Sequence, residues 1–330
     1  MRRSTLLTVS LSLSAMFGLA GCAQSSGETV RAGESSNLST SSSSHAFPIS
    51  RIAASSPSWT SVGGPRVVAV GDIACAPGGT VTPTTCRQAA TAKQARAYDP
   101  KKVLGLGDMQ YESGSLSEFR ASYDKSWGGD LKAITKPIPG NHEYRTPGAS
   151  GYYRYFRNQQ PGGSGYYAFN VGSWRVYALN SNCTKIDCAR ENAWLERDMA
   201  ANPKACTALM LHHPLYSSGY EHGDSPEGRR FWSTALNHDA DLVLAGHDHN
   251  YERFQPMNAD GQVTSSGMAS FIVGAGGKNL YPTRGIREGS VVFDNHRAGV
   301  LAMHLGRGAY GWKYQTIDGQ VMDQGTATCR

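Results

Sequence analysis

Three short segments decide the fold, and their sequences are VVAVGD (residues 67–72), VLGLGD (residues 103–108) and LVLAGH (residues 242–247). Each is a short run of apolar or small residues that ends in a glycine, which is the pattern of a buried strand followed by a sharp turn. An aspartate or a histidine follows each of these glycines. Because the carboxyl ends of parallel strands meet at one edge of a sheet, we expect these polar side chains to gather at one site.

The segments between and after these strands indicate an α/β fold. Helical patterns are expected at Arg87–Tyr98, Leu116–Trp127, Arg190–Ala201 and Glu227–His238. Beyond His249 the pattern changes to strands separated by glycine-rich turns, at Ser270–Val273, Ser290–Phe293, Val300–Leu305 and Trp312–Ile317. We therefore expect two mixed β-sheets packed as a sandwich and flanked by helices, with the carboxyl-terminal strands supplying a second, largely antiparallel sheet.

The amino-terminal residues have the pattern of an export signal. Two arginines precede an apolar run from Leu6 to Ala20, which is too short to span a bilayer comfortably. The run ends in Leu-Ala-Gly-Cys at residues 19–22, which resembles the lipobox of bacterial lipoproteins. We therefore expect membrane attachment through a lipidated Cys22, and an ordinary small-residue cleavage site is the alternative.

A serine-rich stretch that includes Ser41–Ser44 follows the signal and has few large apolar residues. The expected organisation is a lipoprotein-type signal peptide at residues 1–21, a flexible tether at residues 22–60 and one globular domain at residues 61–330. The protein is expected to be exported, either as a cell-surface lipoprotein or as a secreted protein.

Composition and charge narrow the class of protein. The chain has 39% hydrophobic and 18% charged residues, which is enough apolar material for a sizeable core. Removing residues 1–21 leaves 30 basic against 26 acidic residues, a formal charge of +4. A balance this mild, without a run of lysines or arginines, gives no indication of nucleic-acid binding beyond nucleotides as substrates.

The cysteines indicate an oxidising compartment. Six remain when Cys22 is set aside, and an even number in an exported chain suggests three disulfides. Six cysteines permit 15 pairings. The favoured set joins Cys75 with Cys86, Cys183 with Cys188 and Cys206 with Cys329; buried thiols are the alternative, and a zinc ribbon is disfavoured because no pair has CxxC spacing.

Five blocks of polar residues follow or end apolar runs and carry the candidate chemistry. They contain Asp72, Asp108 with Tyr111, Asn141 with His142, His212, and His247 with His249. Oxygen and imidazole ligands without thiolate suit Fe, Mn, Zn and similar cations. Either aspartate alone could instead cap a helix, but a His-x-His pair directly after a buried strand is costly unless a partner satisfies both imidazoles.

The order of these blocks resembles the calcineurin-like metallophosphoesterases. They read Gly-Asp at 71–72, Gly-Asp-Met-Gln-Tyr at 107–111, Gly-Asn-His-Glu at 140–143, Leu-Met-Leu-His at 209–212 and Gly-His-Asp-His at 246–249. The tyrosine three residues after the second aspartate resembles the purple acid phosphatase branch. The first block lacks the family's Asp-x-Gly and the fourth has leucine where valine is common, but neither departure removes a ligand.

This resemblance implies a centre of two metal ions. Asp72, Asp108, Tyr111 and His249 would hold the first, which is ferric iron in the family. Asp108 would bridge to the second, an Fe, Zn or Mn ion completed by Asn141, His212 and His247. A metal-bound hydroxide would then attack phosphorus in a small phosphate-ester substrate.

The leaving alkoxide needs a proton, and two histidines are candidate donors. His142 lies beside a ligand, and His222 follows His212 in Glu-His-Gly at 221–223. His142 could instead orient a ligand, and His222 could be an exposed loop residue. We expect His213 to line a pocket.

The sequence favours a phosphoric ester hydrolase that acts on monoesters, as acid phosphatases do. A phosphodiesterase, nucleotidase or phospholipase-type enzyme could use the same two-metal site, because surrounding loops decide the substrate. A lipoprotein that binds phosphate or metal without catalysis is the alternative from another class. Natural substrate, metals, pH optimum, export route and oligomeric state stay open.

Overall fold

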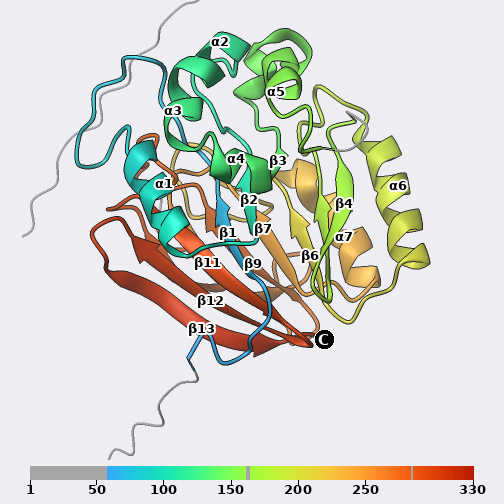
Figure 1. The fold of residues 1–330 in the computed structure, drawn as a ribbon. Coiled ribbons are helices and arrows are strands. Elements are labelled where there is room, and N and C mark those ends of the chain that lie inside the picture. The colour runs from blue at the N-terminus through green and yellow to red at the C-terminus, as the bar shows by residue number, and fades with distance from the viewer. Residues whose placement is uncertain (1–57, 161–163, 284) are drawn as a thin grey trace, which may run out of the picture. The chain divides into compact units, whose positions relative to one another are not determined.

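The computed structural model describes residues 58–160, 164–283 and 285–330, and these form two β-sheets with helices on the outside (Figure 1). The predicted signal peptide and the tether up to residue 57 lie outside the described residues. No helix of the described part is both long and apolar enough to cross a membrane.

The first sheet has the strand order β13-β12-β11-β1-β2-β3. Its strands are β1 (Arg66–Val70), β2 (Lys102–Leu106), β3 (Thr135–Ile138), β11 (Gly299–Gly306), β12 (Ala309–Thr316) and β13 (Val321–Thr328). β1, β2 and β3 pair in parallel, whereas β11 pairs antiparallel with β1, and β12 and β13 continue that antiparallel half. The sheet is therefore mixed, as expected.

The second sheet has the strand order β10-β8-β9-β7-β6-β5-β4. Its strands are β4 (Tyr167–Val171), β5 (Trp174–Ala178), β6 (Thr207–Met210), β7 (Leu242–Ala245), β8 (Tyr251–Met257), β9 (Met268–Val273) and β10 (Ser290–Asp294). β5, β6, β7 and β9 are parallel neighbours, and β4, β8 and β10 pair antiparallel. It is also mixed.

One sequence expectation about these sheets is wrong in detail. The strands beyond His249 do not make a sheet of their own, because β8, β9 and β10 extend the second sheet while β11, β12 and β13 extend the first. The reason is that the parallel strands divide into two groups, and each leaves an edge that needs a partner. The broader prediction of two mixed sheets packed as a sandwich is confirmed.

The two sheets enclose the main core. Alternate side chains of β1 and β11 face alternate side chains of β7 and β9, for example Val67 and Leu301 in one layer and Leu244 and Phe271 in the other. All four are essentially inaccessible to solvent. Because both outer faces are covered by helices, the strands read as nearly continuous apolar runs.

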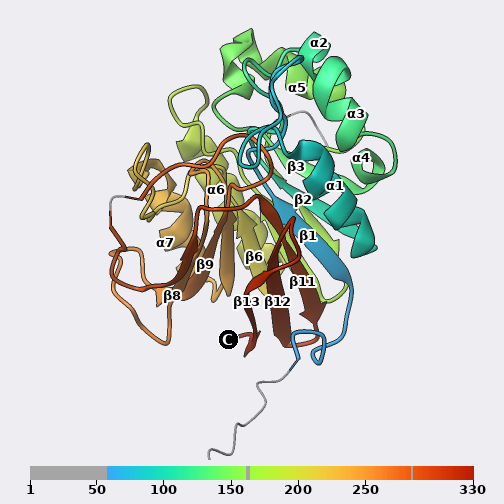
Figure 2. The same cartoon turned by 90° about the vertical axis from the view of Figure 1, so that its left-hand side faces the viewer.

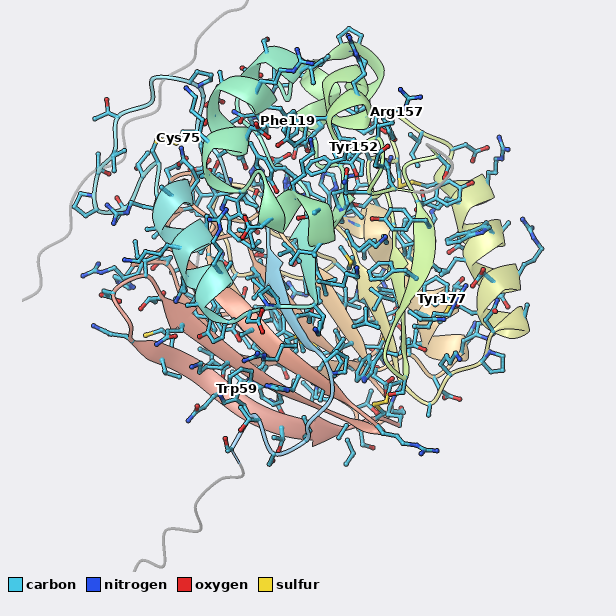
Figure 3. The ribbon with its side chains drawn as sticks, in the orientation of Figure 1. Trp59, Cys75, Phe119, Tyr152, Arg157 and Tyr177 are labelled. Atoms are coloured by element: carbon cyan, nitrogen blue, oxygen red, sulfur yellow. A yellow bond between two sulfur atoms is a disulfide. The ribbon has the colours of Figure 1, made fainter. Side chains whose placement is uncertain are left out.

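Helices cover the outer faces of both sheets, and Figure 2 shows α1 and α7 on opposite sides of the strands. The first sheet carries α1 (Gln88–Ala97), α2 (Leu116–Glu118), a π-helical turn (Phe119–Tyr123), α3 (Asp124–Ser126), α4 (Asp130–Ile134) and α5 (Ser150–Tyr155). The second carries α6 (Cys188–Ala201) and α7 (Arg229–Asn237). Phe119 and Tyr152 belong to the aromatic layer under the first group (Figure 3). All four predicted helical segments are helical.

Three disulfides close the structure, and they are the three pairs that the sequence favoured. Cys75 bonds to Cys86, Cys183 to Cys188, and Cys206 to Cys329. The last joins the residue before β6, in the second sheet, to the residue after β13, in the first, over 123 positions of sequence. It therefore fastens the two layers together at the end of the chain.

A buried ion pair also joins the sheets. Asp323 on β13 accepts hydrogen bonds from Tyr251 Oη (2.6 Å) and Arg253 Nε (2.6 Å) on β8. It also accepts one from Trp312 Nε1 (3.0 Å) on β12. Asp323→Ala removes the acceptor of hydrogen bonds from three side chains and leaves the Arg253 charge without its partner. We expect the free energy of unfolding to fall by about 3 kcal/mol in urea titrations.

Asp260→Ala is the matched control, because Asp260 pairs with Arg229 at 2.9 Å while its side chain stays 79% exposed. An exposed pair contributes under about 1 kcal/mol. Equal unfolding free energies for the two variants would contradict the assignment of Asp323 as an inter-sheet tie.

Candidate metal centre

The candidate ligands lie in the loops that follow five strands of both sheets. Asp72, Asp108 and Asn141 follow β1, β2 and β3 of the first sheet, and His212 and His247 follow β6 and β7 of the second. The backbone joins the sheets here, because Gly71 N donates to Val273 O at 2.8 Å. The site therefore straddles the edges of two sheets, rather than one edge of one sheet as the sequence suggested.

Three of these residues have an unusual backbone. φ is 58° at Asp72, 47° at Asp108 and 74° at His247. Residues with a Cβ rarely adopt this left-handed region, and such strain of roughly 1–3 kcal/mol per residue clusters at functional sites. These turns place Asp72 and Asp108 within reach of His212, and His247 beside the same histidine.

The first group of ligand atoms consists of Asp72, Tyr111 and His249, all buried. Tyr111 Oη lies 2.7 Å from Asp72 Oδ1 and 2.8 Å from His249 Nε2. His249 Nε2 is 3.4 Å from Asp72 Oδ1. Three of the four side chains predicted to hold the first metal therefore point at one another, and the fourth, Asp108, lies in the adjoining group.

The second group consists of Asp108, Asn141, His212 and His247. His212 Nε2 lies 3.0 Å from Asn141 Oδ1, 3.2 Å from His247 Nδ1 and 3.5 Å from Asp108 Oδ2. Ligand atoms of Asp72, Asp108 and His212 all lie within 4.8 Å of one another, so the two groups adjoin. The structure thus brings together all seven side chains that the sequence singled out as ligands.

The hydrogen bonds of the imidazoles fit a cation. His212 Nδ1 donates to Leu106 O at 2.8 Å, and His249 Nδ1 donates to Asn279 O at 2.7 Å. In the neutral ring each Nε2 then carries a lone pair, and this lone pair faces carboxylate, amide or phenol oxygens that also carry lone pairs. Several acceptor atoms that face one another in a buried space are satisfied by metal ions.

The pKa values in this cluster also indicate that the buried carboxylates favour a positive charge beside them. Burial would lower the pKa of the His212 imidazole, but the hydrogen-bonded Asp108 carboxylate outweighs burial and raises the pKa to about 9. Burial would likewise raise the pKa of Asp108, yet His212 holds it well below its usual range. Burial and the neighbouring His213 lower the pKa of His247, which keeps that imidazole neutral and able to bind metal.

Glu143 organises the loop around Asp108, a role that is not evident from its place in the Gly-Asn-His-Glu block. Its carboxylate accepts hydrogen bonds from the backbone N–H groups of Gly140 (2.7 Å), Asp108 (3.0 Å) and Gln110 (3.2 Å). Burial, and then the nearby Asp108 carboxylate, raise the pKa of Glu143 to about 8. A carboxylate that fixes the backbone of a ligand orients that ligand.

Two further residues support the histidines and carried no signal in the sequence. The Ser181 hydroxyl oxygen accepts hydrogen bonds from the backbone N–H of His212 at 3.2 Å and of His213 at 3.0 Å. The ring of Tyr281 stacks on His249, with centroids 3.9 Å apart and planes 8° apart. Both fix the orientation of imidazoles through contacts that are distant in sequence.

Each of the two candidate proton donors lies close to one proposed ligand, His142 to Asp108 and His222 to His247. His142 Nδ1 donates to Glu112 O at 2.7 Å, and its Nε2 lies 4.0 Å from Asp108 Oδ2. His222 is exposed and stacks on His247, with centroids 3.9 Å apart. Partial shielding of the rings from solvent lowers the pKa of both imidazoles.

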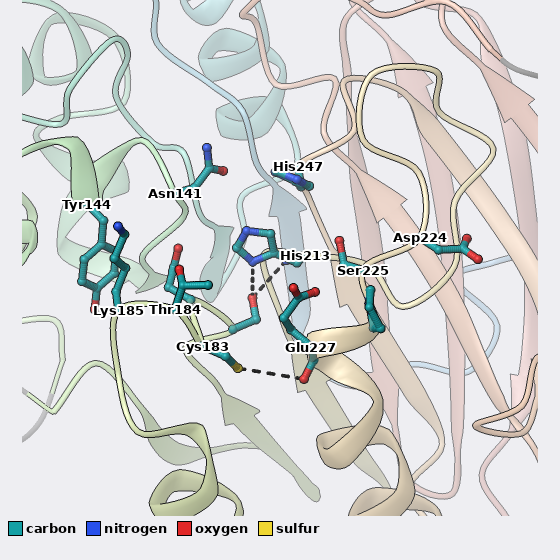
Figure 4. Close-up of a pocket in the computed structure, with 13 residues that line it drawn as sticks. Asn141, Tyr144, Cys183, Thr184, Lys185, His213, Asp224, Ser225, Glu227 and His247 are labelled. Atoms are coloured by element: carbon teal, nitrogen blue, oxygen red, sulfur yellow. Dashed lines mark hydrogen bonds between the residues drawn. The ribbon is translucent and has the colours of Figure 1, made fainter. Parts of the chain in front are cut away.

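A cavity of about 290 Å³ opens beside the second group (Figure 4). Asn141 and His247 lie at one end of it, and Cys183 and Glu227 lie at the other. His213 lines the cavity, as expected, and its Nδ1 is 2.8 Å from Ser181 Oγ. Lys185 and Asp224 add charges of both signs to the wall.

The chain belongs to the calcineurin-like phosphoesterase family. The match to the family model covers residues 65–251, which is more than half of the chain and includes every candidate ligand.

Purple acid phosphatases are among the relatives, which confirms the resemblance drawn from the motifs. Purple acid phosphatase 23 of Arabidopsis thaliana is 27% identical over 226 residues, 57% of this chain and 47% of the relative. The phosphoenolpyruvate phosphatase of Allium cepa is 27% identical over 172 residues, 46% of this chain and 36% of the relative. The chain therefore spans less than half the length of these curated relatives.

The solved structures that resemble this chain agree on the fold. A purple acid phosphatase from seeds of yellow lupin (Lupinus luteus) superposes with a TM-score of 0.65 at 20% identity, over 80% of this chain and 53% of the lupin chain. GAP50, described as the anchor in the inner membrane complex of Plasmodium, superposes with a TM-score of 0.59 at 15% identity over 80% of this chain and 89% of its own. The two mixed sheets with flanking helices therefore match the fold of the lupin purple acid phosphatase.

A buried acid behind the cavity makes stability depend on pH. Glu191 on α6 accepts a hydrogen bond from Asn180 N at 2.7 Å, in the segment that leads to the cavity wall. Burial raises its pKa well above the usual value. Because the unfolded chain ionises this carboxyl at lower pH than the folded protein does, its contribution to the free energy of unfolding falls as pH rises above about 4.5.

Glu191→Gln keeps an acceptor for Asn180 N and removes the ionisation. Relative to wild type, we expect this variant to gain roughly 1–3 kcal/mol between pH 5 and pH 8 in urea unfolding. Glu196→Gln is the control, because Glu196 lies on the same helix and is exposed, and it should gain nothing. Parallel pH profiles for Glu191→Gln and wild type would contradict the expectation.

Proposed function

We propose that this protein is an exported phosphatase that hydrolyses phosphate monoesters at a centre of two metal ions. One observation carries the proposal: two groups of buried ligand atoms meet at the carboxylates of Asp72 and Asp108, beside a cavity that opens to solvent. The relatives named as phosphatases support a phosphoric ester hydrolase.

The proposed ligand set divides between the two groups. Asp72, Tyr111 and His249, with Asp108, would hold ferric iron, because phenolate and carboxylate oxygens are hard ligands. Asn141, His212 and His247 would complete an Fe, Zn or Mn site that shares Asp108. The contacts among these atoms, all between 2.7 and 3.5 Å, support this division.

In the proposed hydrolysis, the metal ions and the side chains of the protein have different roles. When bound, two cations would offset the negative charge of the phosphoryl oxygens and lower the pKa of a water molecule toward neutrality. The alcohol of the ester would occupy the cavity lined by His213, Lys185 and Glu227. His222 and His142 would supply the proton that the leaving oxygen needs, since both lie beside ligand residues.

Export is part of the proposal. Three disulfides in one domain support an oxidising compartment. Anchoring through a lipidated Cys22 rests on the sequence, because the signal and the lipobox lie outside the described residues.

Removing the shared ligand tests the proposal. Purified protein should contain close to two metal ions per chain by elemental analysis and should release phosphate from 4-nitrophenyl phosphate faster than it cleaves the bis-ester. Asp108→Ala should lose both metals and reduce kcat/KM by more than about 10³-fold. Asp130→Ala, at an exposed aspartate paired with Arg96, should keep both metals and full activity. Full activity in Asp108→Ala would end the proposal.

The iron assignment has a separate optical test. A phenolate bound to ferric iron gives a visible charge-transfer band, so the protein should be coloured, and Tyr111→Phe should abolish the colour while the other ligands keep the metal. Tyr144→Phe, which also lies near the centre, should leave the band unchanged. A band that survives Tyr111→Phe would remove Tyr111 from the ligand set.

A further inference from the structure

Asp248 lies between the two histidines of the His-x-His pair and has no assigned role. Its side chain is completely buried. Its Oδ2 accepts a hydrogen bond from the backbone N–H of Gly223 at 3.2 Å. Gly219 packs so closely on the carboxylate that a Cβ there would lie 2.3–2.5 Å from its atoms. The buried acid thus touches a loop on the far side of the ligand histidines.

That loop, Ser217–Asp224, carries His222 and is fastened at several points. Ser217 N donates to Asp224 Oδ1 at 3.0 Å, which closes the loop at its base. Gly219 N donates to Ser217 Oγ at 3.0 Å. Gly223 directly follows His222. Within the described residues, its N–H donates its hydrogen bond to Asp248.

Two backbone hydrogen bonds flank His222, one from Gly223 N to Asp248 at 3.2 Å and one from Tyr220 N to Pro282 O at 2.9 Å. The ring stacks on His247 at 3.9 Å with 21° between the planes, and meets the edge of Tyr281 at 5.7 Å. His222 is exposed, so packing alone does not restrain it. Asp248 lies between His247 and His249 in sequence, so the backbone turn that positions these two histidines also positions Asp248.

We propose that Asp248 is a positioning residue, which through the N–H of Gly223 holds His222 over His247 and so determines how fast esters with poor leaving groups are cleaved. This inference rests on the proposed phosphatase function. A water molecule forms the new bond to phosphorus and releases a proton as the bond between phosphorus and the ester oxygen breaks. The electron pair of the broken bond stays on the ester oxygen, which takes a proton from the protonated His222 ring and leaves as the neutral alcohol. The imidazole regains a proton from water.

The leaving group provides the test. The leaving oxygen of 4-nitrophenyl phosphate needs little protonation, whereas that of glycerol 2-phosphate needs a proton. The measured quantity is the ratio of kcat/KM for glycerol 2-phosphate to that for 4-nitrophenyl phosphate. Asp248→Ala should lower this ratio about 10- to 100-fold, mostly through kcat, with both metals retained. Asp248→Asn keeps an acceptor for Gly223 N and should restore most of the ratio.

Two further variants complete the test. His222→Ala should lower the ratio at least as much, and Asp248→Ala combined with it should add little, because both act through one proton donor. Gly219→Ala, whose methyl group would meet the Asp248 carboxylate, should displace the loop and lower the ratio as well. If Asp248→Ala fails to fold or to bind metal, the ratio measured for Gly219→Ala tests whether Asp248 positions His222.

Three results would overturn the inference while leaving the phosphatase proposal intact. They are an equal loss on both substrates in Asp248→Ala, an unchanged ratio in His222→Ala, and an unchanged ratio in Gly219→Ala. A wild-type protein that turns over neither ester would instead contradict the proposed function itself.

Discussion

The carboxylate of Asp108 is the group on which the rest of the site depends. It is only 2% exposed, and it adjoins Asp72 of the first ligand group while it contacts His212 of the second. Its Oδ1 accepts the N–H of His142 at 2.8 Å, and a Cβ at position 140 would lie 2.2 Å from that oxygen, so only glycine fits there. Burying an ionised carboxylate costs several kcal/mol unless opposite charge or hydrogen bonds compensate. The hydrogen bond from the N–H of His142 compensates part of this cost, and two cations would compensate the remainder.

The ligands of each proposed ion come from both sheets. Asp72 and Tyr111 belong to loops of the first sheet, whereas His249 belongs to the second; Asn141 likewise meets His212 and His247 across the junction. Metal binding would therefore hold the two layers together at one end of the sandwich. Asp323 and the Cys206–Cys329 disulfide do so elsewhere in the described domain. The fold and the cofactor would stabilise each other, because a site assembled from two sheets exists only when they are packed.

Local sequence patterns predicted the elements that depend on residues close together in sequence. Apolar runs that end in Gly-Asp or Gly-His became β1, β2 and β7, and the ligand residues follow them. The pairing of β11 with β1, Arg66 opposite His304, joins segments over 200 residues apart, and no local pattern contains it. β8 was missed because its sequence YERFQPM carries a charged pair, and the buried Glu252 accepts hydrogen bonds from Ser218, a residue distant in sequence. Glu143 and Asp248 were missed as organising groups because most of their partners are backbone N–H groups of loops distant in sequence, those of Asp108 and Gln110 for Glu143 and that of Gly223 for Asp248.

The central claim is that two cations share Asp108 at the junction of the sheets. Anomalous diffraction from crystals of the metal-loaded protein, recorded at the absorption edges of iron, manganese and zinc, tests it directly. The account predicts two peaks, one in contact with Asp72, Tyr111 and His249 and the other with Asn141, His212 and His247, and both in contact with Asp108. A single peak, or peaks that do not touch Asp108, would contradict it.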